Sequence, residues 1–157
     1  MAEPDTPVPD PAPSPSSGPW YHQGIRFACR SCGSCCRGEP GVVWVAPDEV
    51  ELMSRHLGIS RKDFRARYLR RIGFRVSLVE RPDGDCILYH NGCSVYPVRP
   101  RQCRTFPFWP DAMRSPEWFK RALRDCPGAG SGKLYSRSEI ESIIREGRAT
   151  EPPDAHK

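Results

Sequence analysis

The chain has 157 residues, with 24 basic and 19 acidic side chains that give a net charge of +5. This length allows one domain with a hydrophobic core, and no apolar run approaches the ~20 residues of a membrane helix, so no membrane-spanning segment is expected. The basic residues are scattered along the chain rather than gathered in one stripe, which argues against nucleic-acid binding and leaves room for a small anionic partner.

The first nineteen residues are not expected to contribute to the core. Seven of them are proline, and their only charged residues are three acids, so the remainder of the chain carries +8. A segment of this composition cannot bury enough apolar surface to offset its loss of entropy on ordering, which predicts a disordered, polyproline-like tail. We therefore expect a tail over residues 1–19, one folded domain over 20–147 and a frayed tail over 148–157.

The first half of the domain is predicted to hold a strand and two helices. Residues 20–27 are expected to be extended or irregular, and the β-branched run 42–45 predicts a strand. A helix begins at Pro47 and is closed by Gly58. A second helix, capped by Ser60, has apolar residues at helical spacing, namely Phe64, Tyr68, Leu69 and Ile72. Its other face is rich in Arg and Lys and is interpreted as a solvated face.

A three-stranded antiparallel meander is predicted next. Residues 74–80 alternate with period two, which predicts a strand with Phe74, Val76 and Leu78 on one buried face. Tight turns then separate two further short strands, over 86–89 and 93–96.

The last third of the domain is predicted to contain a long loop and two helices. Residues 97–110 include four prolines and are expected to be irregular. Helices follow after the Ser115 cap and after a capping box that starts at Ser136, with a Gly- and Ser-rich linker over 128–132 between them. The fold class is thus α+β, a small cysteine-cluster domain with a short β-meander, three to four helices and long irregular loops.

Four of the eight cysteines fall within one short stretch, Cys29-Arg-Ser-Cys32-Gly-Ser-Cys35-Cys36, which we call the knuckle. Thiolate sulfur is a soft ligand for zinc, copper(I) or iron–sulfur clusters, and two intervening residues let both sulfurs of a Cys-x-x-Cys turn reach one metal. Gly33 permits the positive φ that such a knuckle often needs. Because no signal peptide is apparent, we expect a cytoplasmic, reducing location, where cysteines favour metal over disulfides.

The other four cysteines reach the knuckle only if the fold brings them there: Cys86, Cys93, Cys103 and Cys126. Eight thiols suit two four-ligand sites, one cluster with spare cysteines, or a site of more than one metal. Adjacent residues such as Cys35 and Cys36 rarely both point at one tetrahedral ion. Zinc sites commonly use two separated Cys-x-x-Cys pairs, whereas a cysteine triplet with a distant Cys126-Pro127 follows the ferredoxin arrangement. The pattern therefore favours an iron–sulfur cluster of the 4Fe–4S type over zinc.

Arginines beside the cysteines are candidates for holding an anionic group. A positive neighbour lowers the pKa of a thiol, and a guanidinium is well shaped for carboxylate or phosphate. The candidates for anion or cofactor binding are Arg99, Arg101 and Arg104, and Arg30 and Arg37 also lie beside cysteines. His22 and His90 lie near cysteines too, but histidines in turns are more often exposed than ligating.

On these motifs the chain resembles the YkgJ-like cysteine-cluster family, which is described as chelating zinc or iron. The resemblance covers roughly residues 20–128 and rests on Phe27-x-Cys29-x-x-Cys32-Gly-x-Cys35-Cys36, on Asp-Cys86 and Gly-Cys93-x-x-Tyr96, and on Arg99-Pro100-x-x-Cys103-Arg104-x-Phe106-Pro107. It implies that the cysteines at these positions are metal ligands. The pattern is also similar to that of flagellin lysine N-methylases, but the chain has no separate catalytic region, so the resemblance implies chelation without a reaction.

Three functions follow as alternatives. The preferred one is a stand-alone metal- or cluster-binding module that acts as a carrier, sensor or redox partner. The second is a cluster-dependent enzyme whose anionic substrate contacts Arg99, Arg101 and Arg104. In the third, a closed structural zinc site stabilises a small interaction domain.

Overall fold

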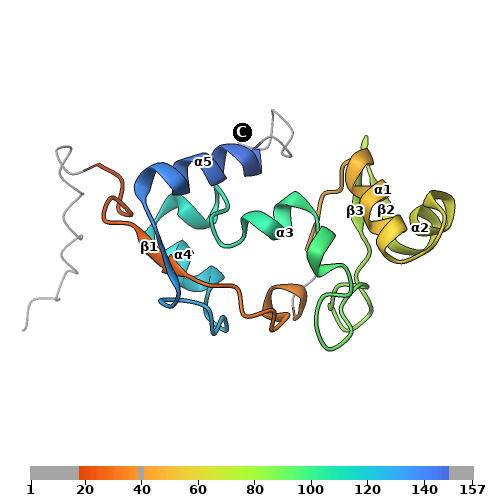
Figure 1. The fold of residues 1–157 in the computed structure, drawn as a ribbon, viewed down its shortest axis with the longest axis horizontal. Helices are drawn as coiled ribbons and strands as arrows, with labels where there is room; N and C mark the ends of the chain where they lie inside the picture. Colours follow the sequence, from red (N-terminus) through yellow and green to blue (C-terminus); the bar gives the residue numbers. More distant parts are fainter. Residues whose placement is uncertain (1–17, 39–40, 149–157) are drawn as a thin grey trace, which may run out of the picture.

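The computed structural model describes residues 18–38 and 41–148. Within them the chain forms five α-helices and two separate two-stranded antiparallel sheets, which is the small α+β fold that the sequence predicted. The elements gather in two lobes at opposite ends of an elongated molecule (Figure 1). The tails predicted at 1–19 and 148–157 lie outside the described residues, apart from Gly18, Pro19 and Arg148.

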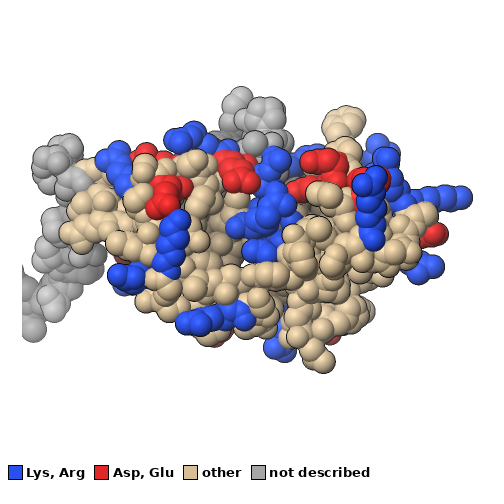
Figure 2. All heavy atoms as spheres, in the orientation of Figure 1, with Lys and Arg blue, Asp and Glu red and all other residues tan. Residues whose placement is uncertain are grey.

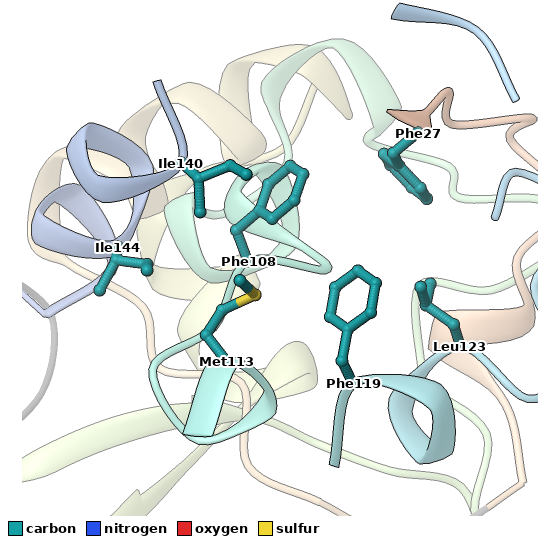
Figure 3. Close-up of a cluster of buried hydrophobic side chains, with 7 residues drawn as sticks. All are labelled: Phe27, Phe108, Met113, Phe119, Leu123, Ile140 and Ile144. Atoms are coloured by element: carbon teal, nitrogen blue, oxygen red, sulfur yellow. The ribbon is translucent and has the colours of Figure 1, made fainter. Parts of the chain in front are cut away.

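The first lobe combines segments from both ends of the described chain. Strand β1 (Ile25–Phe27) pairs antiparallel with β4 (Lys133–Tyr135), and helices α4 (Pro116–Ala122) and α5 (Arg137–Arg148) pack beside them. Its buried side chains form one cluster, shown in Figure 3: Phe27, Phe108, Met113, Phe119, Leu123, Ile140 and Ile144. Ser115 accepts a hydrogen bond from the Trp118 N–H at the start of α4, as expected for a helix cap.

The second lobe has its own core. Helices α1 (Pro47–His56) and α2 (Arg61–Tyr68) pack against a hairpin of β2 (Leu69–Ile72) and β3 (Arg75–Leu78). Segment 43–45 runs along the other edge of β3, where the Val45 N–H donates to the Val76 carbonyl at 3.1 Å. The buried cluster shares no residue with that of the first lobe: Val45, Val50, Met53, Phe64, Leu78, Leu88 and Val95.

The short helix α3 (Arg101–Thr105) lies between the lobes (Figure 1). Side chains from the second lobe fix its start. The buried carboxylate of Glu49 accepts hydrogen bonds from the Arg101 N–H at 2.6 Å and from the Ala46 N–H at 2.8 Å, so one side chain caps both α3 and α1. The Gln102 side chain accepts a hydrogen bond from the Trp44 N–H and donates one to the Val42 carbonyl, so it pairs with this segment as the backbone of a neighbouring strand would. Helix α3 also packs against α5 and thereby connects the lobes.

The helix predicted through Ile72 is wrong beyond Tyr68. Residues 69–72 form strand β2 instead, which pairs with β3 across a tight turn at Gly73, where φ is +59°. The apolar spacing of residues 64–72 fits a helix. However, β3 follows β2 after a short turn, so the backbone N–H and carbonyl groups of 69–72 form hydrogen bonds with β3 instead of within a helix. Phe74 lies in that turn and is fully exposed, so its predicted place on the buried face of the strand is wrong as well.

The predicted meander is confirmed in its first strand, which is β3 (Arg75–Leu78), and is wrong beyond it. Residues 86–89 and 93–96 form turns with isolated bridges, Glu80 to Cys86 and Tyr89 to Cys93, and the strand predicted at 42–45 is reduced to a bridge between Trp44 and Ser77. Part of the loop 97–110 is helical, as α3, because its start is capped by Glu49 from outside the loop. Among the described helices, none is both long and apolar enough to cross a membrane.

Candidate metal centre

Seven of the eight cysteines line one cavity of about 130 Å³ between the lobes: Cys29, Cys32, Cys35, Cys36, Cys93, Cys103 and Cys126. Cys126 packs against the core of the first lobe, and Cys93 packs against that of the second. Cys103 comes from α3, which lies between them. The fold thus brings the distant cysteines to the knuckle from both sides.

The backbone of the knuckle makes a tight turn that requires glycine at position 33. Ser31 and Gly33 both have positive φ, of 53° and 76°, and a 3₁₀ turn follows over Ser34–Cys36. A Cβ at Gly33 would overlap the ring of Tyr89, so glycine is required there for space as well as for conformation. The tight turn points several cysteines of the knuckle toward the same cavity.

The strand that leads into the knuckle is held by residues 128–132, which the sequence suggested were a linker. The Ala28 N–H donates to the Gly128 carbonyl at 3.2 Å, and the Gly130 N–H donates to the Arg26 carbonyl at 3.1 Å. A Cβ at Gly128 would overlap the Ala28 carbonyl, so the two backbones pack directly on each other. This close packing places Cys126 beside the knuckle.

Cys86 is close to the knuckle but lies outside the cavity. Its N–H donates to the Cys36 carbonyl at 2.7 Å, and its side chain lines a neighbouring hollow that Cys35 and Cys36 also reach. The preceding residue, Asp85, contacts the end of the knuckle: its carboxylate accepts from the Gly38 N–H at 3.1 Å and lies 3.7 Å from Arg37. Asp85 belongs to the Asp-Cys86 motif of the family resemblance, but the local sequence pattern did not indicate that its carboxylate contacts the knuckle.

The thiols differ in acidity because they contact one another. Hydrogen bonding by the Cys36 thiol lowers the pKa of Cys35 to about 7 and that of Cys93 to about 6, and the Arg99 guanidinium acts in the same direction on both. The same contacts raise the pKa of Cys36. Burial raises the pKa of Cys103. Cys35 and Cys93 are therefore the readiest to supply thiolate at neutral pH.

The structure separates the three arginines that the sequence grouped as anion ligands. Arg99 and Arg104 line the cavity, together with Arg30. The Arg99 guanidinium stacks on the Tyr96 ring at 3.9 Å and donates to the Tyr96 carbonyl. Arg101 points elsewhere, toward Glu146 at 3.9 Å. The residues that line the cavity include no carboxylate, so thiolates would supply its only negative charge.

Aromatic side chains form the remaining wall of the cavity, and they come from segments far apart in the sequence: Phe27, Tyr96, Phe106 and Tyr135. Tyr96 and Phe106 belong to the motifs quoted for the family resemblance, whereas Tyr135 lies on a strand that the sequence did not predict. His22 and His90 are exposed and do not line the cavity.

All eight cysteines are free thiols. Within residues 18–38 and 41–148, however, no three His, Cys, Asp or Glu side chains are already arranged as a metal-binding group. The donor set fits a metal that prefers sulfur, and the cavity is roughly ten times larger than the ~10–15 Å³ that one water requires. Metal binding would therefore reorient side chains that the backbone has already brought together. The assignment of these cysteines as ligands stays a prediction.

A cavity lined by cysteines between two small lobes is the arrangement expected of a protein that binds metal through thiolates. The sequence profile of the family CxxCxxCC, "Putative zinc- or iron-chelating domain", matches residues 28–127. The chain belongs to this family, as the resemblance in its motifs indicated. The matched range covers the knuckle and all four distant cysteines. No solved structure matches the chain.

Proposed function

We propose that the protein binds iron as an iron–sulfur cluster in the cavity between its lobes and acts as a carrier, sensor or redox module. The observation that supports this is the set of seven cysteines around one cavity. Cysteine thiolates are the usual ligands of such clusters. When bound, the cluster would supply electron storage, and the protein would supply the ligands, the counter-charge and the partial exclusion of water.

A cluster suits this cavity better than a single zinc ion. A structural zinc site is closed, with four protein ligands at about 2.3 Å from the metal, and a 4Fe–4S cluster also takes four cysteines, so the arrangement of the site rather than the number of thiols favours the cluster. The cavity also offers more room than one ion requires. Arg99 lies close enough to the sulfurs to lower thiol pKa values, and it would offset the negative charge of a thiolate-ligated cluster.

Purification without oxygen from iron-replete cells tests the proposal. The protein should be brown and contain iron together with acid-labile sulfide. Colourless protein with stoichiometric zinc and no sulfide would contradict the cluster and favour the structural-zinc function instead.

A second function, an enzyme acting on an anionic substrate, is favoured by one specific observation. Arg30, Arg99 and Arg104 line the cavity, and no carboxylate lines it with them. A substrate carboxylate or phosphate could contact these guanidiniums beside the metal. If the protein is such an enzyme, Arg104→Ala would weaken binding of the anionic substrate while leaving the metal content unchanged.

A further inference from the structure

A second hollow lies outside the cysteine cavity, on the second lobe. It has a volume of about 370 Å³ and is formed by the segment before α1, by α2, by the β2–β3 hairpin and by the first residue of α3. This volume falls within the ~300–1,000 Å³ range of small-molecule sites. We call it the basic hollow. Three arginines line it, Arg65, Arg75 and Arg101, with no carboxylate.

Two arginines of the basic hollow, Arg65 and Arg101, do not line the cysteine cavity and have no role in the metal centre. Arg101 was expected at the cysteines, but it lines this hollow instead and lies 3.9 Å from Glu146. Arg65 belongs to the basic face of α2 that the sequence suggested was merely solvated. Within the described part of the chain, the Arg65 side chain has no ion-pair partner. Figure 2 shows Lys and Arg side chains at the end of the molecule that α1 and α2 form, with Asp and Glu side chains among them.

Aromatic rings accompany these charges. The Trp44 ring lines the hollow and carries the Arg75 guanidinium at 3.9 Å from its centroid. Phe74, at the tip of the hairpin, lines the same hollow and is fully exposed. A single exposed apolar side chain is ordinary by itself. Here it stands at the rim of a hollow that also offers guanidiniums, and a flat ligand could cover it.

We propose that the basic hollow binds a nucleoside phosphate unit, with its base stacked on Phe74 and its phosphates held by Arg65 and Arg101. Stacking on aromatic side chains is available to every base, and guanidinium groups bind phosphate oxygens in a bidentate manner. A ligand that was only anionic would leave the exposed ring unused. The unit could come from a free nucleotide or from single-stranded nucleic acid, which share this chemistry.

Fluorescence anisotropy with dye-labelled ADP and with a dye-labelled single-stranded oligonucleotide tests the proposal on the full-length protein. Measurements near physiological salt screen non-specific attraction. Both Phe74→Ala and Arg65→Ala should weaken binding about tenfold, since each removes a stacking or charge-assisted contact. Tighter binding of the oligonucleotide would identify nucleic acid as the source, and equal or tighter binding of ADP would identify a free nucleotide.

Two matched variants control for general effects of charge and exposure. Arg67 lies on the same helix as Arg65 and is exposed, but it does not line the hollow. Trp118 is a half-exposed aromatic residue in the other lobe. Arg67→Ala and Trp118→Ala should each change the affinity less than about twofold. All four side chains are on the surface, so melting curves should confirm that the variants fold.

Three results would overturn the proposal: no binding of either probe at about 1 mM protein, an affinity unaffected by Phe74→Ala, or displacement of ADP by inorganic tripolyphosphate as effectively as by unlabelled ADP. The last two would show a basic surface without recognition of the base. The hollow and the cysteine cavity have no lining residue in common. The result is therefore independent of whether the cavity holds a cluster, zinc or no metal.

Discussion

Gly33 is the knuckle residue with the least freedom to change. Its φ of +76° lies in the region that only glycine enters readily, and Tyr89 occupies the space where a Cβ would stand. The sequence predicted the positive φ from the Cys-Gly step alone. The sequence did not predict the contact between Gly33 and Tyr89, because these residues are far apart in the chain.

Gly33→Ala should therefore destabilise the protein and lower its metal content. The conformational cost alone is about 1–2 kcal/mol, and displacement of the Tyr89 ring adds to it. Gly58→Ala is the matched control, since Gly58 has a similar φ of +67° but open space around it. Thermal melting and metal analysis should show a loss of metal only for Gly33→Ala. Equal effects of the two variants would mean that the Tyr89 contact is unimportant.

The positions of Cys103 and Cys86 predict different effects of their mutation on metal binding. Cys103 lines the cavity, whereas Cys86 lines only the neighbouring hollow. Cys103→Ser should weaken metal binding by more than the ~10–100-fold typical of losing a partner of a ligand, and Cys86→Ser should leave it nearly unchanged. Metal content after dialysis against a competing chelator measures both. A stronger effect of Cys86→Ser would place the metal on the other side of the knuckle.

At the scale of elements, the starts of helices were predictable and the strand partners were not. Pro47, Ser115 and the pair Ser136–Glu139 start helices through contacts within three residues, which a local pattern reveals. By contrast, β1 pairs with β4 across more than a hundred residues. The strands predicted at 86–89 and 93–96 were inferred from turn residues, but the chain there bends too tightly for a ladder.

Helix α3 shows how the fold positions a cysteine from a proline-rich loop. Protein groups hold this segment through Glu49, Gln102 and the Trp109 indole, which donates to the Gln102 carbonyl at 2.6 Å. Cys103→Ser should therefore leave the tryptophan emission maximum unshifted while metal is lost.

Glu49→Gln should destabilise the protein, because an amide replaces one of the two acceptor oxygens that bind backbone N–H groups. The expected cost is about 1.5–3 kcal/mol, as for hydrogen bonds to a buried charged group. Glu51→Gln on the same helix is the control, since the Glu51 carboxylate makes surface ion pairs with Arg55 and Arg61, worth less than about 1 kcal/mol. Urea unfolding of both variants measures the difference, and similar midpoints would contradict the role of Glu49.

At the scale of the molecule, two cores without a shared residue lie on either side of the cysteine cavity. Composition and cysteine spacing predicted a metal-binding domain, but they could not predict that its site would lie between two lobes. That division depends on contacts between distant segments. Because the ligands would come from both lobes, binding free energy should also hold the lobes together.

Removal of the metal should loosen the contact between the lobes without unfolding either core. Hydrogen exchange of protein treated with a strong chelator should become faster in the knuckle, in residues 93–99 and in 126–132. Exchange in α1 and α5 should change little, since each packs in its own core. Uniformly faster exchange would mean that the metal supports the whole fold, as a structural zinc would.

X-ray absorption at the metal edge of anaerobically purified protein tests the central claim most directly, namely that cysteines from both lobes bind one metal centre. We expect iron with a first shell of sulfur alone at roughly 2.3 Å, a length typical of metal–thiolate bonds, and a second shell of neighbouring iron atoms. The sulfur shell should lose amplitude in Cys93→Ser and in Cys126→Ser, one variant from each lobe. A shell dominated by nitrogen or oxygen, or one unchanged in both variants, would contradict the account.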